Sequence, residues 1–216
     1  MSSPTSVALS DAVVLVGGFP LLSGVDLELA ASSLTVVTGA NGAGKTSLLR
    51  LLAGLVSLSS GTGVVAGVDL KGDLRELRRR VGWLGHEGSF YDDLSASENL
   101  VFAAKALARP TSEVASVLDR VGLASRATTS AKQLSAGQRR RLGLAWLLLR
   151  RPELWLLDEP YASLDDDGRA FFDQLIGDVV ASGATVVVSA HDPLRSSALT
   201  PRTITLAGGL VVGDRS

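Results

Sequence analysis

The chain has 216 residues, 46% of them hydrophobic and 20% charged, and a formal net charge of −1. This size and composition indicate one globular domain with a substantial core, and the near-neutral charge gives no electrostatic reason to expect nucleic acid as a partner. The absence of cysteine excludes disulfides and thiolate chemistry. Residues 1–6 lack the order of a secretory signal, and the most apolar helical pattern, 142–149, is far shorter than the ~20 residues of a membrane span, so we expect no membrane crossing.

Short strands are expected at 13–15, 25–29 and 34–38, the last of them β-branched, apolar and therefore central in a sheet. A glycine-rich turn follows, and LLRLLAGL then predicts a helix that ends near Gly54. Residues 55–72 are rich in glycine and serine and predict loops with a short hairpin. A charged helix at 73–80 and a strand at 81–84 complete this half of the chain.

From about residue 91 to 150 the strand signal disappears and three helical patterns follow one another. Strands return at 154–158 and 184–190 on either side of a helix at 166–182, and the tail at 202–214 suits a terminal hairpin. Apolar strands separated by helices predict a largely parallel sheet that is covered on both faces. The arginine runs at 78–80 and 139–141 are expected to be solvated helix faces rather than binding patches.

The segment GANGAGKT at 39–46 satisfies the pattern G-x-x-x-x-G-K-[ST] between a predicted strand and a predicted helix. Its backbone N–H groups can converge on a phosphate at a helix N-terminus, with Lys45 bridging the β- and γ-phosphates of ATP and Thr46 giving its hydroxyl to Mg²⁺. The alternative, a glycine-rich turn with a chance lysine, is disfavoured by this context. The candidate nucleotide contacts are Asn41, Gly42, Ala43, Gly44, Lys45, Thr46 and Ser47.

Two adjacent acids follow the apolar run LWLL, at the strand end where open α/β sheets bind ligands. Asp158 is expected to hold Mg²⁺, and Glu159 to orient the attacking water or accept its proton. Adjacent acids by themselves are usually a surface turn, but a buried strand before them and a phosphate loop upstream favour the catalytic interpretation.

In LSAGQ at 134–138, Ser135 and Gln138 match a capping box, which by itself predicts only a well-capped helix. Between the phosphate loop and the acidic pair, however, the segment resembles the signature LSGGQ of the ATP-binding-cassette (ABC) ATPases, with Ala136 in place of one glycine. Residues 163–165, SLD, resemble the D-loop of that family, and His191 resembles its switch histidine. The resemblance covers residues from about 7 to 212.

The resemblance implies an α/β fold of the P-loop NTPase class and the ABC ATPase type. Such a fold has a RecA-like mixed-sheet core, an N-terminal antiparallel β subdomain and a helical insertion. It implies a single domain over 1–216, with the catalytic core at about 7–86 and 151–212 and the helical subdomain at about 87–150.

The resemblance also implies partners, because two such domains close head to tail around ATP and Mg²⁺. Ser135, Gly137 and Gln138 would then face the γ-phosphate held by the partner's Lys45, Asp165 would contribute to the dimer contact, and His191 would contact the γ-phosphate of its own subunit. A homodimer, or a paired nucleotide-binding subunit, is therefore expected at the cytoplasmic face of a membrane, bound to separate integral membrane subunits.

The family usually stacks adenine on an aromatic residue upstream of the phosphate loop, and Val16 aligns with that position. An apolar contact from Val16 is weaker and less specific than stacking. Phe19 lies close in sequence and is an alternative adenine contact; packing of Phe19 into the core is equally compatible with the sequence.

GHE at 85–87 follows a predicted strand, where the family has a glutamine that contacts Mg²⁺ and the attacking water and begins the loop that meets the membrane subunit. His86 takes that place, so we expect it at the metal and the water. A zinc site lacks ligands, because only one other histidine and no cysteine are present. An independent catalytic pair of His86 and Glu87 has no further supporting residues.

GHE, LSAGQ and the missing aromatic together resemble one branch of the family, the ATP-binding subunits of haem exporters in cytochrome c maturation. That resemblance implies integral membrane partners that handle haem. A transporter ATPase for another exported cargo, such as a drug or a lipid, would have the same nucleotide chemistry. A soluble, non-transport ABC ATPase is the third alternative, but the chain has neither the second cassette nor the long coiled coil of such relatives.

Overall fold

The computed structural model describes residues 5–85, 90–162, 164–190 and 200–215. They form two sheets, of which the smaller is antiparallel, in the order β2-β1-β4-β5, and the larger has six strands, in the order β10-β9-β3-β8-β7-β6. The antiparallel strands are β1 (Thr5–Val16), β2 (Phe19–Ala30), β4 (Ser60–Val65) and β5 (Val68–Asp69). The others are β3 (Leu34–Thr38), β6 (Val81–Leu84), β7 (Leu154–Asp158), β8 (Thr185–Ser189), β9 (Arg202–Ala207) and β10 (Leu210–Arg215).

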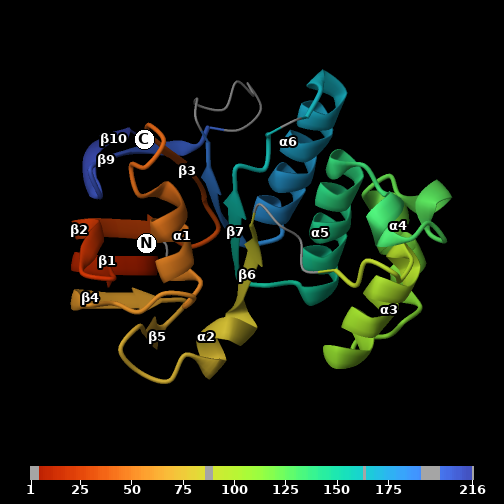
Figure 1. Cartoon of the computed structure of the whole chain (residues 1–216), viewed down its shortest axis with the longest axis horizontal. Coiled ribbons are helices and arrows are strands. Elements are labelled where there is room, and N and C mark those ends of the chain that lie inside the picture. Colours follow the sequence, from red (N-terminus) through yellow and green to blue (C-terminus); the bar gives the residue numbers. More distant parts are fainter. Residues whose placement is uncertain (1–4, 86–89, 163, 191–199, 216) are drawn as a thin grey trace.

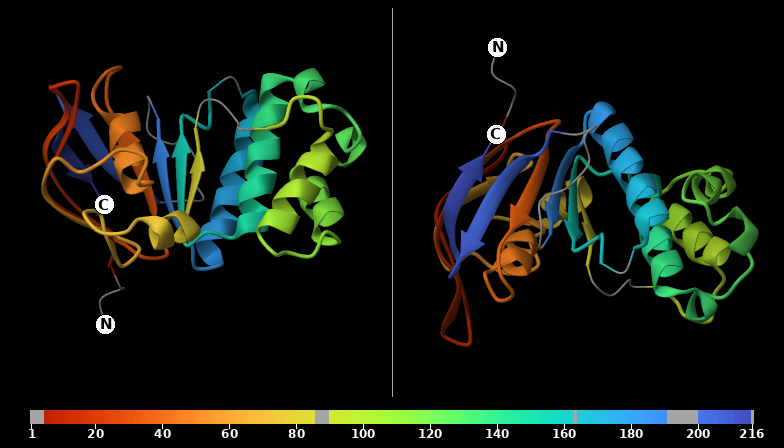
Figure 2. Two further views of the ribbon diagram at one scale, coloured as in Figure 1. Left: turned by 60° about the horizontal axis from the view of Figure 1, so that its bottom comes forward. Right: turned by 90° about the horizontal axis from the view of Figure 1, so that it is seen from above.

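The six-stranded sheet lies between two layers (Figures 1 and 2). Helix α1 and the antiparallel sheet cover one face, α5 and α6 cover the other, and α3 and α4 pack on the far side of α5. The helices are α1 (Lys45–Leu52), α2 (Arg75–Arg80), α3 (Ala96–Ala106), α4 (Glu113–Arg120), α5 (Ala136–Arg150) and α6 (Asp166–Ala181).

Strand β7 shows why both faces are covered. Leu154 and Leu156 pack into the core on the α1 side, whereas Trp155 and Leu157 pack into the core on the α5 and α6 side. Successive side chains of a strand point to opposite faces, so an apolar run can be buried only between two layers. All described strand pairs from β9 to β6 are parallel, and only β10 joins antiparallel to β9. The predicted largely parallel, doubly covered sheet is confirmed.

Helix α5 lies unusually close to β6, because glycines occupy the contact on both elements. A Cβ at Gly143 of α5 would stand 2.4 Å from Leu84 Cδ1, and one at Gly82 of β6 would stand 2.6 Å from Leu147 Cδ2. Both distances are below normal van der Waals contact. This close approach fixes α5 against the edge strand of the sheet.

Three sequence expectations were wrong. Strand β2 extends over Phe19–Ala30 rather than 25–29. Strand β1 extends over Thr5–Val16 rather than 13–15. Register shifts and the positive φ of Asp11 let the strand continue past the polar residues Ser10 and Asp11. These two residues interrupt the alternation of apolar and polar side chains from which a strand is predicted. The run 139–141 is not a solvated face. Arg139 contacts Asp92 and the carbonyl of Ala131, Arg140 contacts three carbonyls, and the Arg141 guanidinium lies 4.4 Å from the ring centroid of Phe171.

No helix in the described part of the chain combines the length and the apolar character that a bilayer crossing requires.

Candidate functional site

The C-terminal ends of four neighbouring parallel strands carry most of the candidate residues. Strand β3 leads into the phosphate-binding loop (residues 39–46), β8 ends at Ser189, β7 ends at Asp158, and β6 ends just before Gly85. These strands are adjacent in the order β3-β8-β7-β6. Ligands of open α/β sheets bind at this edge.

The phosphate-binding loop ends at Gly44, which is the N-cap of α1 and has a φ of 105°. A Cβ there would lie 3.0 Å from the carbonyl oxygen of Leu21, so both the backbone conformation and the contact with β2 require glycine. Among the described residues no side chain caps α1, and its first turn has no acidic residue. Its N-terminal N–H groups are therefore available to an anion.

Lys45 is buried, and its Nζ donates to the carbonyl oxygens of Gly39 at 2.7 Å and Ala40 at 3.1 Å. The ammonium group thus lies over the loop that is expected to hold the phosphates. Asn41 and Gly42 are exposed at the loop tip, and Ser47 is partly buried in the first turn of α1. Ala43 is buried, and its carbonyl accepts from Gly209 N–H, which ties the loop to the β9–β10 turn.

Two residues proposed from the sequence as metal ligands meet across 112 positions of sequence. Thr46 Oγ1 donates to Asp158 Oδ1 at 3.1 Å and to Oδ2 at 3.0 Å. Ser189 Oγ donates to the same Asp158 Oδ1 at 2.6 Å. Asp158 is only 6% exposed, so a buried carboxylate lies among hydroxyl donors directly beneath the start of α1.

Glu159 has the left-handed backbone conformation, with a φ of 47°. Its N–H donates to Ser189 Oγ at 2.8 Å, and its carbonyl accepts from Arg140 at 3.1 Å. A non-glycine residue in this conformation costs about 1–2 kcal/mol and persists where its surroundings fix it. Burial lowers the pKa of the Arg140 guanidinium, while Asp158 and Glu159 act in the opposite direction.

The signature residues form the expected capping box at the start of α5. Ser135 Oγ accepts from Gln138 N–H at 3.2 Å, and Gln138 Oε1 accepts from Ser135 N–H at 3.0 Å. A Cβ at Gly137 would meet no atom of the described residues within 4 Å. Within the described residues no hydrogen bond joins the signature to the phosphate-binding loop, and the sheet separates α1 from α5 (Figure 1).

Asp165 is the N-cap of α6, and its Oδ1 accepts from Gly168 N–H at 2.8 Å. Val16 and Phe19 face each other in the register of β1 and β2, where they are 53% and 76% exposed. Packing of Phe19 into the core, one of the two sequence alternatives, is therefore wrong. The contact between Leu21 and Gly44 brings this end of β2 beside the phosphate-binding loop.

Some predictions fall on positions that the structure does not describe. His86 and Glu87 lie outside the described residues, as do Ser163 of the D-loop segment and the predicted switch residue His191.

Two residues of the site were missed by the sequence analysis. Ser189 carried a usable signal, because it is a polar residue at the C-terminal end of an apolar strand and pairs in register with Asp158. Arg140 carried none, because it stands among three consecutive arginines whose contacts differ completely.

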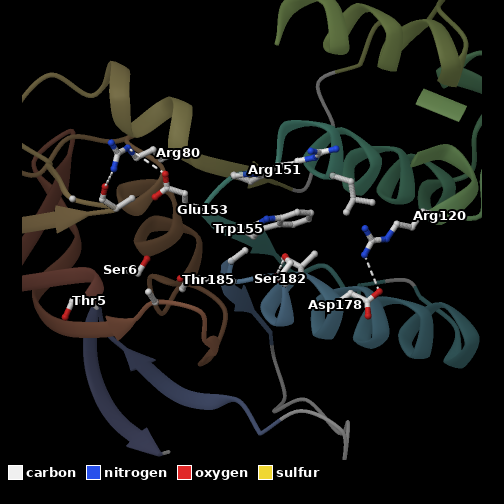
Figure 3. Close-up of a pocket in the computed structure, with 18 residues that line it drawn as sticks. Thr5, Ser6, Arg80, Arg120, Arg151, Glu153, Trp155, Asp178, Ser182 and Thr185 are labelled. Carbon is white, nitrogen blue, oxygen red and sulfur yellow. Dashed lines mark hydrogen bonds and ion pairs between the residues drawn. The ribbon is translucent and has the colours of Figure 1, made fainter. Parts of the chain in front are cut away.

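A large cavity of about 830 Å³ lies at the opposite edge of the sheet, beside the first residues of β7 and β8 (Figure 3). Three arginines line it, but each has an acidic partner: Arg80 with Glu76, Arg120 with Asp178, and Arg151 with Glu113. Each also stands at the C-terminal end of a helix, where a cation offsets the helix dipole. The positions of these three arginines are therefore explained by the helix ends and the ion pairs, without a ligand in the cavity.

Comparison with known proteins agrees with this geometry. Residues 22–162 match the family model described as ABC transporter. A protein of Rhodopseudomonas palustris strain BisB18, named "Cytochrome c biogenesis ATP-binding export protein CcmA", is 43% identical to this chain over 178 residues. The match covers 82% of this chain and 88% of the relative. In Salmonella typhi a protein of the same name is 37% identical over 189 residues, covering 88% and 91%.

Solved structures give the same fold. The ATP-binding subunit of an ABC transporter superposes with a TM-score of 0.87 at 21% identity, over 97% of this chain and 89% of the other. A dimeric ATP-binding cassette in a post-hydrolysis state with ADP and Pi gives 0.86 at 23%, over 97% and 98%. The fold match, the family match and the close relatives agree: the chain belongs to the ABC transporter family, as a nucleotide-binding, ATP-hydrolysing subunit.

Proposed function

We propose that this chain hydrolyses ATP at the carboxyl edge of its parallel sheet, with the phosphates on the loop at 39–46. The observation that carries the proposal is the contact between Thr46 and Asp158, which joins the start of α1 to the end of β7. Lys45 now donates to loop carbonyls and would exchange them for phosphate oxygens. Asn41, Gly42, Ala43, Gly44 and Ser47 would supply the remaining contacts.

The donor set fits Mg²⁺. A hydroxyl and a carboxylate are the hard oxygen ligands that this ion prefers, and it usually takes one or two protein ligands, with phosphate oxygens and waters completing its shell. Among the described residues no cluster of three acidic or histidine side chains offers a metal site. Thr46 and Asp158, with His86 as a further candidate, would hold the ion, which supplies charge neutralisation at the phosphates.

Glu159 is the candidate base. It follows Asp158 directly, and its backbone is fixed on both sides of the residue, by Ser189 and by Arg140. A carboxylate carried on a backbone held in this way can orient a water molecule at the γ-phosphate and take its proton. His191 would contact the same phosphate.

The signature would complete the site of a second copy in a head-to-tail dimer. Gly137 lies in the first turn of α5, and no atom of the described residues crowds the space beside it. Free space there supports close approach by a group from outside the chain, which we assign to the γ-phosphate bound by the partner. Ser135 and Gln138 would accompany Gly137, Asp165 would contribute to the dimer contact, and the exposed Phe19 or Val16 would meet the adenine.

Membrane subunits would bind beside β6. A cavity of about 380 Å³ lies there between the sheet and α5, lined by Leu55, Trp83, Gly85, Phe90 and Trp146 among others. Its lining includes Gly85, which immediately precedes the segment that the family resemblance assigns to the membrane-subunit contact. Bound in this way, the chain would act at the cytoplasmic face of a membrane.

The transporter would serve cytochrome c biogenesis, with haem-handling membrane partners. The support is the name shared by relatives at about 40% identity over four fifths of this chain, together with the GHE and LSAGQ variants. Deletion of the gene should abolish maturation of c-type cytochromes, and expression of the Lys45→Ala variant should not restore it. Normal cytochrome c levels in the deletion strain would contradict the assignment of cargo without affecting the ATPase assignment.

The catalytic proposal is tested with Glu159→Gln. The purified variant should lose ATP turnover, still bind ATP, and elute as a dimer with Mg²⁺ and ATP, because the amide keeps the shape of the side chain but cannot accept the proton. Glu153→Gln, an exposed acid at the opposite edge of the sheet, is the matched control and should turn over like the wild type. Full turnover by Glu159→Gln would show that another group is the base.

A further inference from the structure

Arg140 of α5 connects the ends of two strands of the candidate site. Its Nη1 donates to the carbonyl oxygen of Gly85 at 2.9 Å and, more weakly, to that of Asp158 at 3.3 Å, and its Nη2 donates to that of Glu159 at 3.1 Å. One guanidinium therefore ties the segment after β6 to the segment after β7. Its planar fork, with several N–H groups in fixed directions, suits such a bridge.

The contact acts on the residue whose geometry matters most. Glu159 has a φ of 47°, which its own side chain disfavours, so its conformation depends on its neighbours. Ser189 of β8 binds its N–H, and its carbonyl accepts from Arg140 of α5 and from the N–H of Ala162 in the following turn, each at 3.1 Å. With both peptide groups held, the direction of the Glu159 Cα–Cβ bond is set.

The helix that carries Arg140 is itself fixed. Gly143, one turn further along the same face, lets α5 approach Leu84, and Gly82 lets β6 approach Leu147. The reach of Arg140 to Gly85 follows from this close packing. Neither neighbouring arginine shares the site: Arg139 turns to Asp92 and Ala131, and Arg141 to Val121 and Phe171.

We propose that Arg140 is a positioning residue for ATP hydrolysis: by binding the carbonyls of Gly85, Asp158 and Glu159 it holds the Glu159 carboxylate where the attacking water lies. The inference rests on the proposed function of Glu159. On this proposal Arg140 affects the chemical step and has little effect on nucleotide binding. The reason is that, among the described contacts, none joins Arg140 to the phosphate-binding loop.

Arg140→Met tests the proposal, since methionine keeps an unbranched side chain and good helix propensity but has no N–H donor. We expect kcat to fall at least about tenfold with KM for ATP within about twofold of wild type, the pattern of an interaction needed in the transition state. Arg139→Met and Arg141→Met are matched controls on the same helix. They lose an ion pair or a ring contact and should keep kcat within about twofold.

Arg140→Lys provides a second variant that keeps the charge but has one donor nitrogen in place of the planar fork, so its kcat should lie between those of wild type and Arg140→Met. Binding of a fluorescent ATP analogue shows that each variant is folded. Unchanged kcat in Arg140→Met, or an equal loss in all three methionine variants, would overturn the inference about Arg140. The proposed function would still stand if the wild type turns over ATP and Glu159→Gln does not. A wild-type protein without ATP turnover would overturn both.

Discussion

Replacing Ser189 with alanine removes one hydroxyl that serves two residues of the site. Ser189 is fully buried, donates to Asp158 Oδ1 at 2.6 Å and accepts from Glu159 N–H at 2.8 Å. Alanine fits the space without a clash, so the loss of stability reports the two hydrogen bonds and little else.

The magnitude follows from these bonds. A hydrogen bond to a charged group contributes about 1.5–3 kcal/mol, and a buried donor left without a partner costs about 1–3 kcal/mol. Asp158 keeps its contact with Thr46, and the Glu159 N–H is only partly buried, so both contributions fall in the lower half of their ranges. The free energy of unfolding should fall by about 2–4 kcal/mol, which lowers Tm by about 5–15 °C at this chain length.

Thermal unfolding followed by circular dichroism measures the change, with Ser116→Ala as control. The Ser116 hydroxyl bonds the carbonyl of Glu113 on an exposed turn of α4, and its removal should change stability by no more than about 0.5 kcal/mol. A Tm for Ser189→Ala within about 1 °C of wild type would refute the account of how β8 supports Asp158 and Glu159.

Two further predictions concern the nucleotide and the water. Phe19→Ala should weaken ATP binding about 5- to 150-fold without lowering Tm, because stacking on a base contributes about 1–3 kcal/mol and Phe19 is 76% exposed. A Kd within twofold of wild type, or a larger loss in Val16→Ala, would argue against Phe19 as the adenine contact. His86→Gln should flatten the acidic limb of the pH–rate profile, because an amide cannot gain a positive charge in mild acid, whereas an imidazole can. An unchanged limb would exclude His86 as its source.

The parts of the fold that sequence patterns predicted well are those where local chemistry and burial agree. The strands at 34–38, 81–84 and 154–158 were predicted to the residue, because each is a short apolar run bounded by turn signals or motifs. Strand β1 was predicted too short, because its alternation is interrupted at Ser10 and Asp11, where the register shifts. The irregular register arises from the pairing of β1 with both β2 and β4, and a short stretch of sequence around β1 does not reveal that pairing.

The site divides in the same way. The phosphate-binding loop, the acidic pair and the capping box are contiguous motifs, and the sequence is sufficient to identify them. The contact of Arg140 with Gly85 is not contiguous: it depends on how closely α5 approaches β6, which two glycines 61 positions apart decide. Three identical residues in a row therefore have three unrelated environments, and only packing separates them.

Helix α5 carries residues that would serve two different ATP sites of the proposed dimer. In the proposed dimer Ser135 contacts the nucleotide of the partner, whereas Arg140 on the same helix contacts the carbonyls of its own site. These residues are about 7.5 Å apart along the helix axis. In the proposed dimer, a displacement of the signature would therefore reach the Glu159 carbonyl through the Arg140 guanidinium. Hydrolysis at one site of the dimer should therefore depend on whether the other site holds ATP.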